Sequence, residues 1–221
     1  MQDICRTRGD TYFCLSVCFD YPSEKVVEPA SARAIAETIE SLEHVGGLES
    51  LADEVNNFEA ELARNAHSPD AVLSNLQIEY SRLFLGPTKP QVYPYEAAFL
   101  SQSGWPTTTS SELASAYRQE GLKLAPGFKE SPDHISIEFE FMSHLCCQEM
   151  KARERNDAES LCCYRRQQRA FLGNHIVHWV PVCLAAVERA AVVGFYRSLA
   201  RIARGFVVWD YERIEASGGK Q

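Results

Sequence analysis

The feature that most constrains this chain is the recurrence of apolar residues at intervals of three and four positions. Apolar side chains follow this spacing over residues 48–62 and again over residues 73–84. Residues 192–206 carry the same pattern, and residues 135–146 contribute a further stretch. Because this spacing places apolar side chains on one face of a helix, each stretch is predicted to be an amphipathic helix lying on a core.

Signals for β-strands are poor by comparison. The chain shows no sustained alternation of polar and apolar residues and no hairpin dipeptide between β-branched runs. We therefore expect an all-α fold. Its 221 residues suit one globular helical domain spanning residues 1–221. About eight to ten helices of ordinary length would fill such a chain.

Two breaks interrupt the helical pattern. The first is a long proline-rich loop predicted at residues 86–106, and the second is a candidate hinge at residues 121–132. Long proline-rich loops are uncommon inside compact domains and are often functional. The hinge would separate an N-terminal helical part, about 1–120, from a C-terminal part, 133–210. A hinge of this kind permits domain swapping, so the sequence allows either a monomer or a domain-swapped dimer.

Charge and hydropathy narrow the class of protein. The net charge of −8 argues against a nucleic-acid binder and favours a basic partner, such as a peptide that carries arginines. The most apolar stretch, 180–196, is broken by Glu188 and Arg189, so no transmembrane segment is predicted. The N-terminus lacks the apolar region of a signal peptide. We expect a cytoplasmic protein.

The eight cysteines do not form a recognisable framework. None is part of a CxxC motif, and two pairs, at 146–147 and 162–163, are adjacent in sequence. That spacing suits neither a disulfide framework nor a tetrahedral zinc site. They are interpreted as small buried hydrophobic residues in a reducing compartment, with a metal or redox role as the alternative.

The segment from Tyr80 to Tyr95 carries the most information. A helix is predicted to end at Leu85, because Gly86 and Pro87 do not extend it well. The chain then passes three prolines, and the aromatic residues of this segment would cluster at the corner. Such a cluster could form one wall of a groove for an apolar peptide. On physical grounds alone, the favoured interpretation is that these aromatic residues close the core.

A second informative segment begins at Ser131. Ser131 or Asp133 could cap the helix that starts here, with Pro132 in its first turn. The functional alternative is that Asp133 and His134 present an anion and a titratable imidazole to a ligand. Helix caps are commoner than sites, so the capping role is favoured.

A competing hypothesis is a helical metal-dependent hydrolase. His175 and His178 lie at nearby helix positions and could bind a metal together with Asp133 and His134. A packing role for both histidines is favoured. The order Asp-His is the reverse of that in helical phosphohydrolases, and the chain carries no HExxH, phosphate loop or dinucleotide fingerprint.

Four sequence blocks together point to a family. They read YSRLFLGP followed by PYE, then PDHISIEFEFM, then FLGNHIVHWVP, then FYRSLARIARGFV, and they extend from about Tyr80 to Phe206. In order and spacing the chain resembles the TorD/DmsD/NarJ family of redox-enzyme maturation chaperones, and its TorD-like branch in particular. It departs from the family pattern at Ser131, where a proline is expected, and at Thr88, where a tryptophan is common. Glu130 could still supply the acidic position.

The resemblance implies an all-helical protein without turnover activity and without a cofactor of its own. Such proteins bind the twin-arginine leader peptide and the apo form of a molybdopterin-dependent oxidoreductase subunit until its cofactor is inserted and before export. The NarJ branch acts on the enzyme body instead. By this resemblance the peptide-binding residues would be Leu83, Phe84, Gly86, Pro87, Pro94, Tyr95, Pro132, Asp133 and His134.

Overall fold

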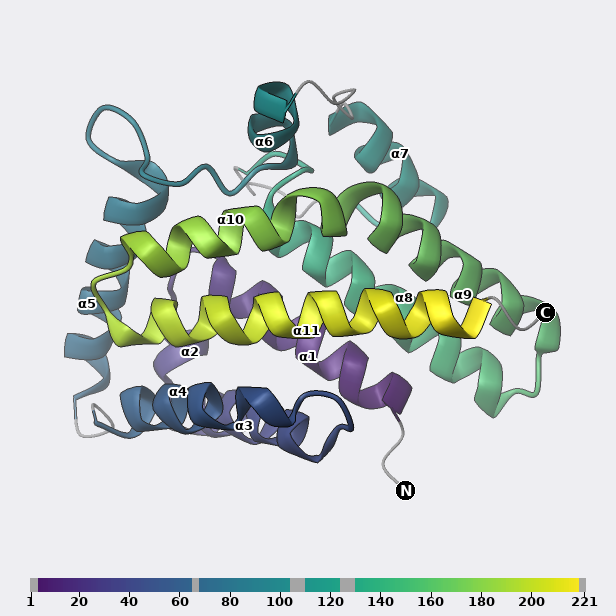
Figure 1. Ribbon diagram of the computed structural model, residues 1–221, viewed down its shortest axis with the longest axis horizontal. Coiled ribbons are helices and arrows are strands. Elements are labelled where there is room, and N and C mark those ends of the chain that lie inside the picture. The colour runs from purple at the N-terminus through teal and green to yellow at the C-terminus, as the bar shows by residue number, and fades with distance from the viewer. Residues whose placement is uncertain (1–3, 65–67, 104–109, 124–129, 219–221) are drawn as a thin grey trace.

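The computed structural model describes residues 4–64, 68–103, 110–123 and 130–218, and its regular structure is helical throughout these ranges (Figure 1). The predicted all-α class is confirmed. The α-helices are α1 Ile4–Phe19, α2 Glu24–Val27, α3 Pro29–Glu40, α4 Ala52–Arg64, α5 Pro69–Tyr80, α6 Glu96–Ser103, α7 Ser110–Gln119, α8 Ile135–Glu154, α9 Ala158–Phe171, α10 Val177–Ala190 and α11 Gly194–Gly218. Short 3-10 turns lie at Ser41–His44 and Glu49–Leu51, and π-helical turns lie at Ser81–Leu85 and Leu172–Ile176.

The core lies where α1 packs against α8 and α11. The ring of Tyr12 contacts Phe139 and Phe206, with centroids 5.9 and 4.9 Å apart. The first helix also approaches α8 closely, because a Cβ added to Gly9 would lie 3.2 Å from the Cβ of Cys146. Helices from the beginning and the end of the chain therefore share one hydrophobic core.

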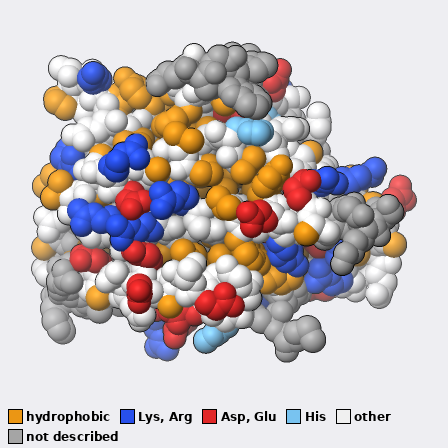
Figure 2. Space-filling view, viewed as in Figure 1, with side chains coloured by type: hydrophobic (Ala, Val, Ile, Leu, Met, Phe, Trp, Pro, Cys, Tyr) orange, Lys and Arg blue, Asp and Glu red, His pale blue; other side chains and the backbone are white. Residues whose placement is uncertain are grey.

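The remaining helices surround this centre. Figure 1 shows α3 and α4 along one side of α11, α10 along its other side, and α6 and α7 beyond α10. The helix α5 closes the end of the molecule opposite the two termini. On the viewed face, hydrophobic side chains gather over α10, while acidic and basic side chains are interspersed over α11 (Figure 2).

A π-helical turn joins α9 to α10, so the chain runs helically from Ala158 to Ala190. By length and composition this run could cross a membrane, with a mean hydropathy of 1.5 in its most apolar window. Within the fold 44% of that window is buried, and core helices of soluble proteins pass the same test.

The loop predicted at residues 86–106 is shorter than expected. The helix α6 begins at Glu96, and residues 104–106 lie outside the described residues. Asp133, from a distant segment, caps the start of α6, because its carboxylate accepts the N–H of Ala97. Of the candidate hinge at 121–132, residues 124–129 lie outside the described part of the chain. Gly121 begins it with a positive φ of 75° just after α7.

The cysteines divide into three groups, because five are buried, Cys147 and Cys163 are half-buried, and Cys162 is exposed. All eight are free thiols. The interpretation as buried hydrophobic residues is confirmed for one group: Cys5, Cys14, Cys18, Cys146 and Cys183. It is wrong for Cys162, which is exposed on α9.

Candidate functional site

The helix α5 ends in a π-helical turn, Ser81–Leu85, that reverses the chain at Gly86. The N–H of Gly86 donates to the carbonyl of Ser81 over 2.6 Å, and its φ of 62° lies in the left-handed region that favours glycine. A Cβ at this position would overlap the backbone carbonyl of Lys89. The predicted helix end at Leu85 is confirmed, and the tight reversal requires glycine.

The loop that follows is fixed to the turn rather than hanging free. The N–H groups of Gln91 and Val92 both donate to the carbonyl of Leu83 over 2.9 Å, and the Val92 side chain is buried. A π-helical turn frees a carbonyl from the ordinary helical pattern, and here that carbonyl anchors the loop. The segment leading to Pro94 and Tyr95 therefore has a defined path.

The two informative segments of the sequence meet at Tyr95 and His134, which form an antiparallel β-bridge. The N–H of Glu96 donates to the Asp133 carbonyl, and the N–H of Ile135 donates to the Pro94 carbonyl, each over 3.0 Å. The rings of Tyr95 and His134 lie edge to face with centroids 5.1 Å apart. The structure thus brings together residues that lie about forty positions apart in the sequence.

We call this junction of residues 94–96 with residues 133–135 the corner. Asp133 lies inside the corner with 3% of its surface exposed. One carboxylate oxygen accepts the N–H of Ala97 over 3.2 Å, and the other accepts the hydroxyl of Ser110 over 3.0 Å. Because Ala97 is in the first turn of α6, the carboxylate both satisfies a free backbone donor and complements the helix dipole. The expected cap is therefore real, but Asp133 caps α6 and not α8.

The cap of α8 is His134. Its Nδ1 accepts the N–H of Ser136 over 3.2 Å, so the neutral ring carries its proton on Nε2, which lies 3.5 Å from the hydroxyl of Tyr80. Burial lowers the pKa of His134 to about 4, although the nearby carboxylates of Glu130 and Asp133 oppose this shift. The expectation that Ser131 or Asp133 caps α8 is wrong, because the chain turns into the helix one residue later.

A partly accessible polar pair lies at the edge of the corner. The hydroxyl of Tyr95 donates to the carboxylate of Glu130, and both residues are half-buried. Burial and this neighbouring carboxylate raise the pKa of the Tyr95 hydroxyl. Beside this pair, the carbonyl of Pro132 accepts the hydroxyl of Tyr117 over 2.9 Å. Pro132 therefore lies in the turn before α8 and not in its first turn.

Two buried carboxylates lie behind the corner. Glu96 is fully buried and lies 3.2 Å from Nδ1 of His175, while the indole of Trp179 donates to Glu138 over 3.1 Å. Burial raises the pKa of Glu138 well above its ordinary value, and the charge of Glu96 adds to this effect. The favoured packing role of His175 agrees with its contact to Glu96.

The residues of the hydrolase hypothesis do not gather into a metal site. Within the described ranges, no group of three or more His, Cys, Asp or Glu side chains could hold a metal ion. The ring nitrogens of His134 face Ser136 and Tyr80, and the oxygens of Asp133 are occupied by α6 and α7. The hydrolase hypothesis therefore has no geometric support.

The nine predicted peptide-binding residues differ in exposure. Pro87 is exposed, and Gly86, Tyr95 and Pro132 are half-buried. The others are buried: Leu83, Phe84, Pro94, Asp133 and His134. Phe84 packs on the rings of Tyr80 and Tyr196, with centroids 4.8 and 6.1 Å away, as a core residue does.

The apolar residues that do face solvent here are Leu85 and Tyr93, which are 47% and 41% exposed. Each is one position away from a buried residue that was predicted to bind, either Phe84 or Pro94. Neighbouring positions of a turn or an extended strand point in different directions, so a shift of one residue exchanges inside for outside. The sequence did not predict which side chains of this segment are accessible, and the peptide-binding role of the segment stays a prediction.

Known proteins match most of the chain. The sequence pattern of the family described as "Nitrate reductase delta subunit" matches residues 48–185, more than half of the chain. The chaperone protein TorD of Vibrio cholerae is 27% identical over 92% of this chain and 90% of its own length. A perchlorate reductase assembly chaperone from Dechloromonas aromatica is 33% identical over 53% of this chain and 51% of its own length.

A solved structure shares the fold. It is that of a redox enzyme maturation protein from Archaeoglobus fulgidus, which aligns with a TM-score of 0.52 and 22% identity over 94% of this chain and 96% of that one. The solved structure shares the helical fold, and the sequence relatives are assembly chaperones. The chain belongs to the TorD/NarJ family of redox-enzyme maturation chaperones, the family described as the nitrate reductase delta subunit.

Proposed function

We propose that this protein is a cytoplasmic chaperone that matures a molybdenum-cofactor oxidoreductase. It binds the twin-arginine leader peptide and the apo form of the client subunit until the cofactor is inserted, and only then allows export. The similarity to TorD over nine-tenths of both chains supports this role. The similarity to a perchlorate reductase assembly chaperone supports a reductase as the client.

The observation that carries the leader-peptide site is the exposure of two apolar residues, Leu85 and Tyr93, on the same segment as the half-buried Tyr95. Leu85 ends the π-helical turn, and the loop that follows is held by hydrogen bonds to Leu83 and to the cap of α8. A fixed apolar surface binds a peptide with little loss of its own conformational freedom. The apolar part of the leader packs on this surface.

The leader arginines bind at Glu130. Its carboxylate is half-buried and contacts only the Tyr95 hydroxyl among the partners seen, so a guanidinium can reach it. Asp133 is less suited, because it is buried with both oxygens hydrogen-bonded within the chain. Paired contact between guanidinium and carboxylate is strong and favours arginine over lysine. Leu83, Phe84 and His134 then support the surface from inside.

The test is a titration of a fluorescently labelled twin-arginine leader peptide, followed by fluorescence anisotropy. We expect Tyr93→Ala and Glu130→Gln each to weaken binding about ten-fold, from loss of apolar contact and of a charged hydrogen bond. Phe13→Ala is the matched control, because Phe13 is an exposed aromatic residue on α1, 56% accessible and outside the corner.

A peptide with two lysines in place of the arginines separates charge from geometry. It should bind wild-type protein more weakly than the arginine peptide and lose less affinity in Glu130→Gln. Wild-type affinity in both Tyr93→Ala and Glu130→Gln would refute this site. Substitutions of Phe84 and Asp133 are poor tests, because both residues are buried and their loss disturbs the fold.

A further inference from the structure

The first turn of α6 is held from two sides. On one side the carboxylate of Asp133 caps it. On the other side Glu96, the first residue of α6, extends its fully buried carboxylate to His175. Nδ1 of His175 lies 3.2 Å from Oε2 and 3.3 Å from Oε1 of Glu96, and no other side chain in the described ranges hydrogen bonds to this carboxylate. Two later segments of the chain therefore fix where α6 begins.

His175 lies in the π-helical turn Leu172–Ile176, which joins α9 to α10. Such turns inside helices are often found at functional sites. The side chain of His175 is 17% exposed, and its ring lies 4.9 Å from the ring of Phe171 between centroids. The imidazole is therefore packed in a fixed position behind the corner.

Trp179 supports α6 one helical turn further along. Its ring lies 5.7 Å from the ring of Phe99 in α6, and its indole N–H donates to Glu138 of α8 over 3.1 Å. Residues four apart on a helix share a face, so His175 and Trp179 both meet α6 from the junction of α9 and α10 (Figure 1). This junction is the rear support of the corner.

The position of Glu96 also sets the position of Tyr95, the residue before it. The backbone of Tyr95 pairs with that of His134, and its hydroxyl donates to Glu130. A buried carboxylate is costly without a partner, so loss of the His175 contact favours arrangements in which Glu96 moves toward solvent. That movement would carry Tyr95 with it and separate the hydroxyl from Glu130.

We propose that His175 is a positioning residue of the leader-peptide site, which acts through Glu96 to hold Tyr95 and Glu130 in place. His175 lies behind the site and binds no part of the leader itself. This inference rests on the proposed function, because it assigns a role within the same site.

The test replaces the imidazole in two ways. His175→Leu keeps an apolar side chain against Phe171 but removes the donor, whereas His175→Asn keeps an N–H donor close to the place of Nδ1. Fluorescence anisotropy measures affinity for the labelled twin-arginine leader, and hydrogen–deuterium exchange of the protein alone measures opening of residues 95–100. We expect His175→Leu to bind the leader about five-fold more weakly and to exchange faster, and His175→Asn to restore both.

His144→Leu is the matched control. The side chain of His144 is 19% exposed and lies 3.6 Å from the carboxylate of Glu120, which follows the C-terminal end of α7. This variant should change neither the affinity for the leader nor the exchange of residues 95–100. If His175→Leu does not fold, His175→Gln takes its place, because its amide reaches a different position and should give the same effects to a smaller degree.

Wild-type affinity in His175→Leu, together with weaker binding by Tyr93→Ala, would overturn the role of His175 and leave the leader-peptide site intact. Unchanged exchange of residues 95–100, or an equal effect of His144→Leu, would also overturn it. Failure of His175→Asn to restore binding would reject the hydrogen bond to Glu96 as the route. If wild-type protein does not bind the leader, the proposed function fails, and faster exchange in His175→Leu would then show a structural role alone.

Discussion

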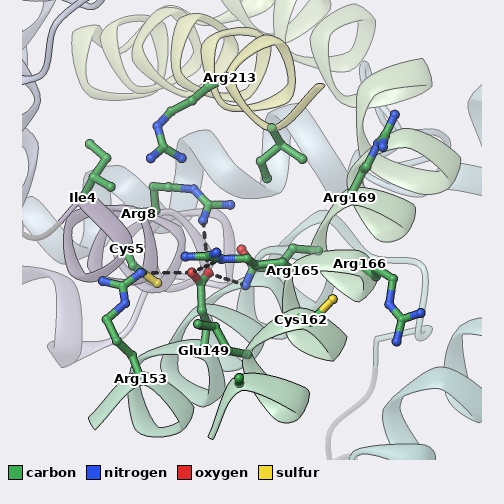
Figure 3. A pocket seen from close by; sticks show the side chains of 14 residues that line it. Ile4, Cys5, Arg8, Glu149, Arg153, Cys162, Arg165, Arg166, Arg169 and Arg213 are labelled. Carbon is green, nitrogen blue, oxygen red and sulfur yellow. Dashed lines mark hydrogen bonds and ion pairs between the residues drawn. The ribbon is translucent and has the colours of Figure 1, made fainter. Parts of the chain in front are cut away.

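The corner between α6 and α8 and the ion-pair cluster around Arg8 hold buried polar groups in different ways. In the corner, Asp133 and His134 accept backbone N–H groups of their own chain, and burial keeps His134 neutral. In the cluster, Arg8 forms a buried ion pair with Asp210, and Glu149 accepts from Arg153 and Arg165 (Figure 3). The first arrangement satisfies its groups mainly with backbone donors, whereas the second uses ion pairs between side chains of different helices.

This difference assigns different roles to the two regions. Polar groups that are already hydrogen-bonded fix a shape and offer little to a ligand, so the proposed leader peptide contacts side chains on the outer surface of the corner. The ion pairs of Arg8 with Asp210 and Glu149 join α1 to α11 and α8. One region therefore fixes the loop of the proposed peptide site, and the other holds helices of the core together.

The largest expected effect breaks the buried ion pair. Asp210 also accepts the Tyr12 hydroxyl over 2.9 Å, and it is fully buried. Asp210→Asn should lower the free energy of unfolding by about 3 to 5 kcal/mol, because it leaves the buried charge of Arg8 with only the longer contact to Glu149, at 3.9 Å. Urea denaturation monitored by circular dichroism measures this loss. The double variant Arg8→Met/Asp210→Leu should lose much less, and an equal loss in both would mean that packing and not charge is responsible.

The next effect concerns the neutral His134. Its pKa is about 4 in the folded protein and about 6.5 when exposed, so the unfolded chain binds more protons between these values. Stability from this residue is therefore complete above pH 6.5 and decreases as the pH falls toward 4, by roughly 3 kcal/mol in all. Urea denaturation at a series of pH values measures the loss. His134→Asn, which keeps a capping acceptor, should flatten this part of the profile, and an unchanged slope would exclude His134 as its source.

The smallest of the three effects tests the rigidity of the corner. Gly86→Ala forces a side chain into a left-handed position and against the Lys89 carbonyl, which should cost about 2 kcal/mol of stability. The control is Gly46→Ala, because nothing lies within 4 Å of a Cβ there, and its effect should stay within about 0.5 kcal/mol. Thermal unfolding compares the two. If they are equally stable, the turn at Gly86 is not a constraint on the loop.

The amphipathic helices were predictable from the sequence, but α1 was not. Its buried residues include Thr7, Arg8, Thr11 and Ser16 as well as apolar ones, so no apolar stripe marks one face. Those polar residues are buried because partners exist elsewhere, as Asp210 does for Arg8 across 202 positions. Periodicity detects burial only where burial is apolar.

The candidate site shows the same division. The breaker residues Gly86 and Pro87 were sufficient to locate the helix end, and the sequence around Asp133 predicted a cap. Which helix Asp133 caps depends on where α6 lies, and the start of α6 at Glu96 depends in turn on Asp133. No local sequence pattern reveals such a dependence between two distant segments.

The sequence by itself determined the helical class, the family and the helix end at Leu85, because these follow from periodicity, the order of the four blocks and breaker residues. Tertiary structure decided that Phe84 faces the core while Leu85 and Tyr93 face solvent. It also decided that arginines from α1, α8, α9 and α11 line one pocket. The physical reason is that the exposure of a side chain and the partners of a charged group depend on contacts between distant segments. These contacts form only when the chain is folded.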